Sequence, residues 1–264
     1  MLDDFMVNTW ISASMIAVVA GVVGLFVVIR GSSFAAHALP LGAFSGGAAA
    51  SVLGISPLIG LLAFSGLGVA GISQLGRRGR HEVATALSLV MLLGLGALFL
   101  SMTTEYSQTV YALLFGEVLG VSSGDLIPVA AGSGVSIALI VMLYRPLLLS
   151  SLSPELAEAR GVSARRMELL FLTVVALTTA MALPVVGALL VFSLMVGPAS
   201  AARAVTNQPL RAMLFSAAIS VVTVWASIAL SFVSNWPIGF FVGALGALAY
   251  GLGRTSAWAA VVRP

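Results

Sequence analysis

Residues 8–29 read NTWISASMIAVVAGVVGLFVVI, and no charged side chain interrupts them before Arg30. An α-helix needs about 20 predominantly apolar residues to cross the hydrocarbon core of a bilayer. The chain contains further stretches of this kind, at 34–55, 57–75, 83–102, 126–144, 167–185, 187–205, 212–233 and 237–253. The sequence therefore predicts an all-α fold, a polytopic bundle of about nine transmembrane helices.

The composition of the whole chain agrees with a protein embedded in lipid. Of its 264 residues, 60% are hydrophobic and 8% are charged, and the mean hydropathy is +1.13. A typical soluble domain has roughly 45–50% apolar and about 25% charged residues. We interpret residues 1–264 as a single transmembrane domain, because the predicted spans leave no room for a soluble catalytic domain.

Several classes of function are disfavoured by what the chain lacks. It has no cysteine, which excludes disulfides, thiolate metal sites and thiol catalysis. All 12 basic residues are arginines, and they are scattered between hydrophobic stretches, which speaks against nucleic-acid binding. The chain also lacks the Gly-x-x-x-x-Gly-Lys-(Ser/Thr) phosphate loop, so we expect it to hydrolyse no ATP itself.

The positions of the arginines predict the topology. Residues 108–121 are apolar but too short to cross the bilayer, and they suit a re-entrant or interfacial helix. If they do not cross, every arginine lies on one side, at positions 30, 77, 78, 80, 145, 160, 165, 166, 203, 211, 254 and 263. Because arginine is retained in the cytoplasm, we expect a multi-pass protein of the plasma membrane with its N-terminus outside and its C-terminus in the cytoplasm.

A short helix is predicted in the longest polar loop, 145–166. Ser153 can cap its N-terminus, Pro154 suits the first helical position, and Glu155 suits the positive end of the helix dipole. Gly161 suits a left-handed stop. Such well-defined ends favour a docking surface for a cytoplasmic partner over a simple connector.

This loop resembles part of a known family. Residues 153–161, SPELAEARG, are similar to the Asp-Pro-Glu-x-Ala-x-x-x-Gly loop of the zinc/manganese-type ABC transporter permeases, the integral membrane subunits of metal importers. Further stretches resemble segments of the same family in the same order, at 26–39, 111–126 and 187–203. The last begins GALLVFSLMVGPA and is similar to the family's Gly-x-Leu-Leu-Val-x-x-Leu-Leu-x-x-Pro-Ala segment.

The resemblance implies a permease that pairs with itself as a homodimer, receives cargo from an extracytoplasmic substrate-binding protein and is driven by a separate ABC ATPase. ATP would be bound by that partner subunit, and no cofactor by this chain. The short helix near 153–161 would be the coupling helix that docks into the ATPase. The residues implied at this contact are Ser153, Pro154, Glu155, Ala157 and Gly161.

The implied cargo is a divalent metal ion or a metal complex, although one motif departs from the family. The family carries Asp-Ala-Leu-Ser-His-Ala early in its second helix, where the Asp and His can coordinate a cation. Aligned on Ser33-Phe34, this chain has His37 at the Asp position and Leu41 at the His position. A softer cation, a chelated metal or another small ligand therefore remain alternatives, and His37 is the best candidate metal ligand.

The candidate residues of the transport pathway are few. His37 is an ionisable group inside a span, which marks a functional site unless the imidazole only hydrogen-bonds a neighbouring helix. Pro40 removes a backbone hydrogen bond, and either frees carbonyls to line a cavity or simply kinks the helix. The remaining candidates are Ser193, Met195, whose thioether favours soft metals, and Glu117 beside the short outer segment. Alternatively, Ser193 and Met195 only pack against neighbouring helices, and Glu117 is only solvated.

Two other functions stay open. A proton-coupled secondary transporter needs acidic side chains at mid-membrane depth, whereas the candidates lie near predicted span ends. They are Glu105, Glu117 and Glu168. An intramembrane hydrolase would pair His37 with Ser45 or Ser65, but no Gly-x-Ser-Gly surrounds either serine.

Two charged side chains near the cytoplasmic ends of spans carry local expectations. Glu168 lies two residues from Arg166 in the sequence and is expected to form an interfacial ion pair with it. His81, beside Glu82, lies in a basic loop where solvation is the simplest expectation.

Overall fold

The computed structural model describes residues 4–76, 81–103, 113–116 and 121–262. Within these ranges the regular structure is helical and no residue lies in a strand, which confirms the all-α prediction. The helices are α1 (Asp4–Ile29), α2 (Ser33–Leu53), α3 (Pro57–Leu75), α4 (His81–Ser101), α6 (Ser123–Leu152), α7 (Pro154–Ala159), α8 (Ala164–Val186), α9 (Ala188–Val205), α10 (Pro209–Ser234) and α11 (Ile238–Val262).

The number of spans agrees with the sequence. In the part of the chain that the structure describes, 9 helices are long and apolar enough to cross a membrane. Helix α7, with 6 residues, is too short. Two helices extend well past their predicted ends: α11 continues to Val262 instead of ending near residue 253, and α6 continues to Leu152 instead of ending near residue 144. Leu147 is fully buried beyond that point, so packing extends the helix. Arg145 therefore belongs to α6, and the connection to α8 is shorter than predicted.

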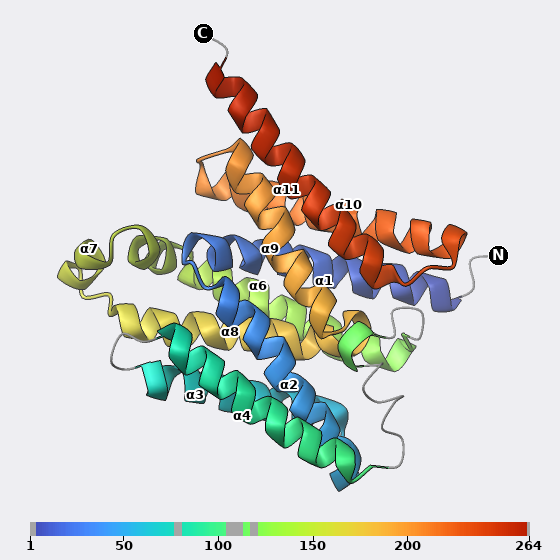
Figure 1. Ribbon diagram of the computed structural model, residues 1–264. Helices are drawn as coiled ribbons and strands as arrows, with labels where there is room; N and C mark the ends of the chain where they lie inside the picture. Colours follow the sequence, from blue (N-terminus) through green and yellow to red (C-terminus); the bar gives the residue numbers. More distant parts are fainter. Residues whose placement is uncertain (1–3, 77–80, 104–112, 117–120, 263–264) are drawn as a thin grey trace.

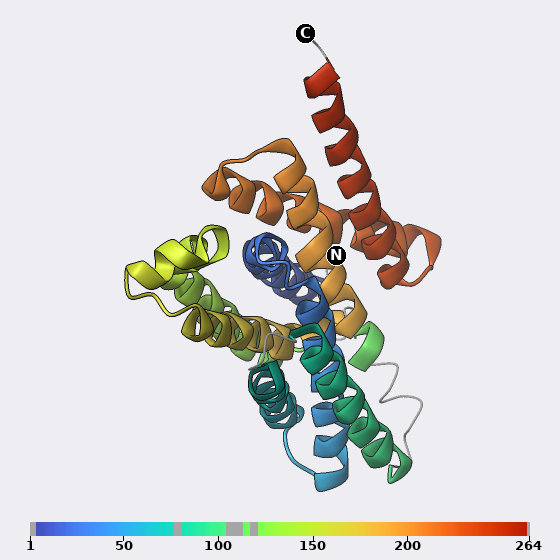
Figure 2. The ribbon, with the colours of Figure 1, turned by 60° about the vertical axis from the view of Figure 1, so that its left-hand side comes forward.

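The helices form three groups (Figure 1). Helices α1, α6 and α8 run together through the middle of the bundle, and α2, α3 and α4 pack on one side of them. On the other side α9 crosses from the end of α8 to α10 and α11, and α1 contacts both α9 and α10. Helix α7 projects at one end, and α11 leans away from the bundle toward the C-terminus (Figure 2). This arrangement places the turn between α1 and α2 at the same end as α7.

The main core lies where α1, α8 and α9 meet. Its largest fully buried side chains include Phe26, Phe171, Leu194 and Met195. A second, smaller core joins α2, α3 and α4 to the later turns of α8. Helices α2, α3 and α4 therefore form a packed group that contacts α8 through the second core.

The short apolar segment 108–121 is described only in part. Leu113 is buried, and a Cβ added to Gly47 of α2 would lie 2.8 Å from its side chain. Gly116 has a φ of +75°, and a Cβ added to Gly187 would lie 2.4 Å from the Gly116 nitrogen. The backbone at 113–116 thus packs against the junction of α8 and α9. Most of the predicted re-entrant or interfacial helix lies outside the described residues and stays a prediction.

The close approach of α2 and α3 yields a stability prediction. A Cβ added to Gly60 of α3 would lie 2.1 Å from the carbonyl oxygen of Gly46, so Gly60→Ala must push the helices apart. We expect a loss of about 1–3 kcal/mol, seen as a lower unfolding temperature in detergent. Gly66→Ala on the same helix meets no atom within 4 Å and should be neutral or gain up to about 1 kcal/mol from helix propensity. Equal stability of the two variants would contradict this packing.

Candidate functional site

His37 lies in the second turn of α2, where that helix contacts α9. Its side chain is half-buried, and its ring meets Phe192 edge-on, with ring centroids 4.6 Å apart and an interplanar angle of 63°. The Nδ1 atom is buried and has no hydrogen-bond partner among the residues that the structure describes. A buried nitrogen without a partner costs stability, and it retains the capacity to bind a ligand.

Pro40 follows on the same helix, one turn closer to its C-terminal end. It is buried, and α2 continues past it as an α-helix to Leu53. Because proline has no N–H, the carbonyl of Ala36 lacks the usual donor four residues along. The bundle therefore tolerates a missing backbone bond beside His37.

The structure separates the other pathway candidates from His37. The hydroxyl of Ser193 faces α11 and donates to the carbonyl of Val242 at 3.5 Å. Met195 is fully buried in the main core, and a Cβ added to Gly24 of α1 would lie 2.0 Å from its carbonyl oxygen. Helix α9 thus presents Phe192, rather than these two residues, to the imidazole. Two acidic candidates, Glu105 and Glu117, lie outside the described residues.

Within the residues that the structure describes, no hydrogen bond joins Ser45 or Ser65, the serines of a possible hydrolase, to His37. The Ser45 hydroxyl donates to the carbonyl of Leu92 on α4. Ser65 is buried in α3, and its hydroxyl has no partner. Among the residues that the structure describes, no three His, Asp or Glu side chains gather where they could hold a metal ion.

Helix α7 has the predicted position and a well-defined stop. Gly161 has a φ of +75°, its N–H donates to the Glu158 carbonyl at 2.9 Å, and the N–H of Val162 donates to the Ala157 carbonyl at 2.8 Å. These two bonds form the Schellman motif, in which a left-handed glycine closes a helix. The predicted cap at Ser153 was wrong, because its side chain makes no capping bond.

The surface of α7 is almost wholly exposed. Glu155 and Leu156 in its first turn face solvent, and Ala157 is the buried residue of the helix, with no exposed surface. Of the predicted coupling residues, Ala157 thus anchors α7 to the bundle, while Pro154 and Glu155 are open to a partner.

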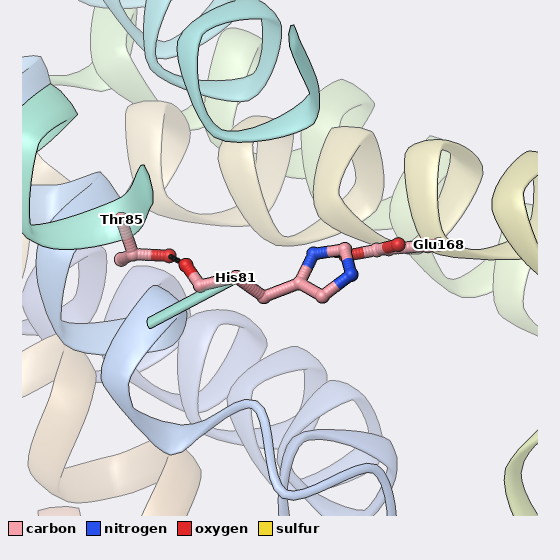
Figure 3. Close-up of polar contacts among 3 residues, drawn as sticks. All are labelled: His81, Thr85 and Glu168. Atoms are coloured by element: carbon pink, nitrogen blue, oxygen red, sulfur yellow. Dashed lines mark hydrogen bonds and ion pairs between the residues drawn. The ribbon is translucent and has the colours of Figure 1, made fainter. Parts of the chain in front are cut away.

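A polar cavity of about 420 Å³ lies beside α7, and the sequence did not indicate it. Residues from six helices and from the turn between α1 and α2 border it, among them Arg30, His81, Ser150, Pro154 and Glu168. His81 Nδ1 of α4 lies 3.0 Å from Glu168 Oε1 of α8 (Figure 3). The hydroxyl of Thr85, one turn further along α4, donates to the His81 carbonyl at 2.8 Å (Figure 3).

These contacts correct two expectations. Within the described residues the ion pair of Glu168 is with His81, not with Arg166, and His81 is not simply solvated. The pair joins residues far apart in the sequence, so no local pattern could reveal it. The one usable signal was that Glu168 lies inside a predicted span, where an ionisable group needs a partner.

Arg30 is the most constrained charge of this cavity. One of its terminal nitrogens, Nη1, donates to the hydroxyls of Ser150 and Ser151, each at 3.1 Å. Its guanidinium carbon lies 5.3 Å from the centre of the Phe171 ring. Burial lowers the pKa of Arg30, and the nearby Glu168 carboxylate raises it. The guanidinium nevertheless keeps its charge, because its intrinsic pKa is so high.

Comparison with known proteins places these features in a family. Residues 2–253 match the model of the ABC 3 transport family. The chain is 30% identical over 243 residues to the manganese import system permease protein ScaB of Streptococcus pneumoniae, covering 89% of this chain and 84% of that protein. It is 25% identical over 197 residues to the high-affinity zinc uptake system membrane protein ZnuB of Haemophilus influenzae, covering 74% and 76%.

A solved structure shares the fold. The chain superposes on PsaBC from Streptococcus pneumoniae, determined in complex with a Fab, with a TM-score of 0.85. The match has 23% sequence identity and covers 94% of this chain and 90% of that chain. The arrangement of helices is therefore one that a solved structure also has.

Proposed function

The chain belongs to the ABC 3 transport family, and from this premise we propose that it is the permease of an importer whose cargo is a divalent metal ion or a metal complex. The observation that carries the proposal is the family match across nearly the whole chain. The names of the relatives, which refer to manganese and to zinc, support a metal as cargo.

The imidazole of His37 supports a cargo that includes a metal. Neutral imidazole is a common metal ligand, and the buried Nδ1 of His37 is free of hydrogen bonds from the described part of the chain. The His-Ala pair of the family motif also fits His37-Ala38 directly, which places Ser33, one turn earlier on α2, at the Asp position. A hydroxyl is a weaker ligand than a carboxylate, so this register too favours a softer cation or a chelate.

The partners follow from the division of labour in such importers. The chain has no phosphate loop, so a separate ABC ATPase supplies the ATP-binding site, and α7 is the surface that docks into it. A second copy of the permease completes the pathway, and an extracytoplasmic binding protein delivers the cargo. This chain itself holds no cofactor.

We expect α7 to be needed for ATPase docking. Gly161→Val places a β-branched residue at a φ of +75°, which costs about 1–2 kcal/mol and disrupts the stop of α7. Glu155→Arg reverses an exposed charge in its first turn. When a tag on this chain is used to purify the complex from its native cells, both variants should retain less ATPase than the unaltered permease.

Glu82→Gln serves as the control, because it changes a carboxylate of the same end of the bundle outside α7. If all three variants bring the same amount of ATPase as the unaltered protein, α7 is only a connector. If no ATPase copurifies even with the unaltered permease, the proposed function fails.

We expect His37 to be required for uptake but not for folding. His37→Leu removes the buried nitrogen without a partner, so the unfolding temperature should stay the same or rise. Uptake of radiolabelled Mn²⁺ or Zn²⁺ should fall by about tenfold or more, as when a group that supports a metal is lost. Full uptake by this variant would show that His37 is structural.

Ser33→Asp supplies the complementary test. It creates a carboxylate four residues before His37, on the same helix face, and should shift preference toward bare Mn²⁺ or Zn²⁺. Unchanged preference would mean that Ser33 does not face the cargo.

The orientation of the chain in the membrane rests on its arginines, which are retained in the cytoplasm. Because the chain has no cysteine, one introduced thiol can be followed alone. A thiol at Ser234, in the last turn of α10, should react with an impermeant reagent added outside the cell. A thiol at Asn207, between α9 and α10, should react only after permeabilisation. The reverse pattern would invert the topology.

A further inference from the structure

Helix α7 is stiffly joined to α6. Ser153 alone separates the two helices. Its N–H donates to the Leu149 carbonyl of α6 at 2.9 Å, and its carbonyl accepts from the Ala157 N–H of α7 at 3.0 Å. Ser153 is thus hydrogen-bonded to both helices although Pro154, which has no N–H, interrupts the ladder between them. With one linking residue, a displacement of α7 pulls on the last turn of α6.

Arg30 holds that last turn of α6. It donates to the hydroxyls of Ser150 and Ser151. Both hydroxyls donate in turn to the carbonyl of Leu147, so their own hydrogens are committed and their lone pairs are left for the guanidinium. Hydrogen bonds to a charged donor are among the stronger ones. The Phe171 ring of α8 lies against the guanidinium and fixes its position.

The chain leads from Arg30 directly into α2. The Ser32 N–H donates to the Val27 carbonyl at 2.9 Å, and the Gly31 N–H donates to the Val28 carbonyl at 3.2 Å. With Gly31 at a φ of +65°, this is the same Schellman closure that ends α7. Helix α2 starts at the next residue, and His37 lies in its second turn. No flexible segment separates Arg30 from the candidate cargo ligand.

From these three connections we propose that Arg30 is a positioning residue that transmits the displacement of α7 to α2 during transport. The proposal rests on the function proposed above, since it takes α7 as the ATPase contact and His37 as a pathway residue. The His81–Glu168 pair of the same cavity contributes little, because its side chains are 50% and 31% exposed and exposed ion pairs are weak.

The test compares Arg30→Gln with two matched variants in the complex purified from native cells and reconstituted in liposomes. Arg254→Gln removes an exposed arginine of α11 and controls for the loss of one topogenic charge. His81→Gln breaks the other polar contact of the cavity. The measured quantities are the amount of ATPase retained, the rate of ATP hydrolysis, and the Mn²⁺ or Zn²⁺ transported per ATP hydrolysed.

We expect the Arg30→Gln complex to retain the ATPase and to hydrolyse ATP. The amount of metal transported per ATP should fall about tenfold, which is the effect expected from losing one hydrogen bond to a charged group. Ser150→Ala with Ser151→Ala should act in the same direction. Arg30→Lys, which keeps a charged donor, should recover part of the loss. Both control variants should match the unaltered complex.

A second readout separates transmission from simple destabilisation. A single cysteine at Leu41, half-exposed on α2, should change its rate of labelling when ATP is added to the unaltered complex. In the Arg30→Gln complex this response to ATP should be lost although the ATPase remains bound.

The outcomes that overturn the inference are distinct from those that overturn the function. Unchanged coupling and an intact response at Leu41 in Arg30→Gln would show that Arg30 transmits nothing. Loss of the ATPase from that complex would show that Arg30 serves docking instead. Failure of the unaltered permease to bring any ATPase would remove the proposed function, and the inference with it.

Discussion

Close contact between helix backbones holds this bundle together, because helices in lipid gain nothing by exchanging one apolar neighbour for another. Small residues allow that contact: Gly46 and Gly60 bring α2 and α3 together so closely that neither position has room for a Cβ. Hydroxyls supplement it, as where Ser216 of α10 donates to the carbonyl of Gly21 on α1 at 2.7 Å. The positions of the functional side chains depend on this packing.

Close helix packing also determines where polar and charged side chains lie in the molecule. Serine and threonine hydroxyls inside the bundle mostly satisfy carbonyls, as Ser45 does at Leu92, whereas the charged contacts described above gather in the cavity beside α7. His37 differs from the hydroxyls in being ionisable, and its buried Nδ1 has no hydrogen-bond partner among the described residues. The bundle thus leaves one imidazole available on α2 and concentrates its ionic contacts where α7 joins.

Much of the fold could be predicted from the sequence, because each span is a continuous apolar stretch and its length alone indicates a membrane helix. Helix α7 was also recognisable, since Pro154 and Gly161 act through local backbone geometry. The extension of α6 to Leu152 was not, because burial of Leu147 against other helices decides it. The contacts of Arg30 with Ser150, and of His81 with Glu168, join distant parts of the chain and leave no periodic pattern. Sequence likewise could not tell which neighbour each face of α9 meets, so Ser193 was grouped with His37 although it faces α11.

The single anchor of α7 has a consequence for how such a protein can evolve. Ala157 alone of this helix is buried, and the helix is closed at Gly161 by its own backbone. The exposed positions, such as Glu155 and Leu156, can therefore be exchanged without repacking the membrane bundle. If α7 is the ATPase contact, a duplicated permease could acquire a different ATPase partner through a few surface substitutions on α7 while keeping its cargo. The choice of ATPase would then depend on α7 and the choice of cargo on the membrane bundle, so the two could change independently in evolution.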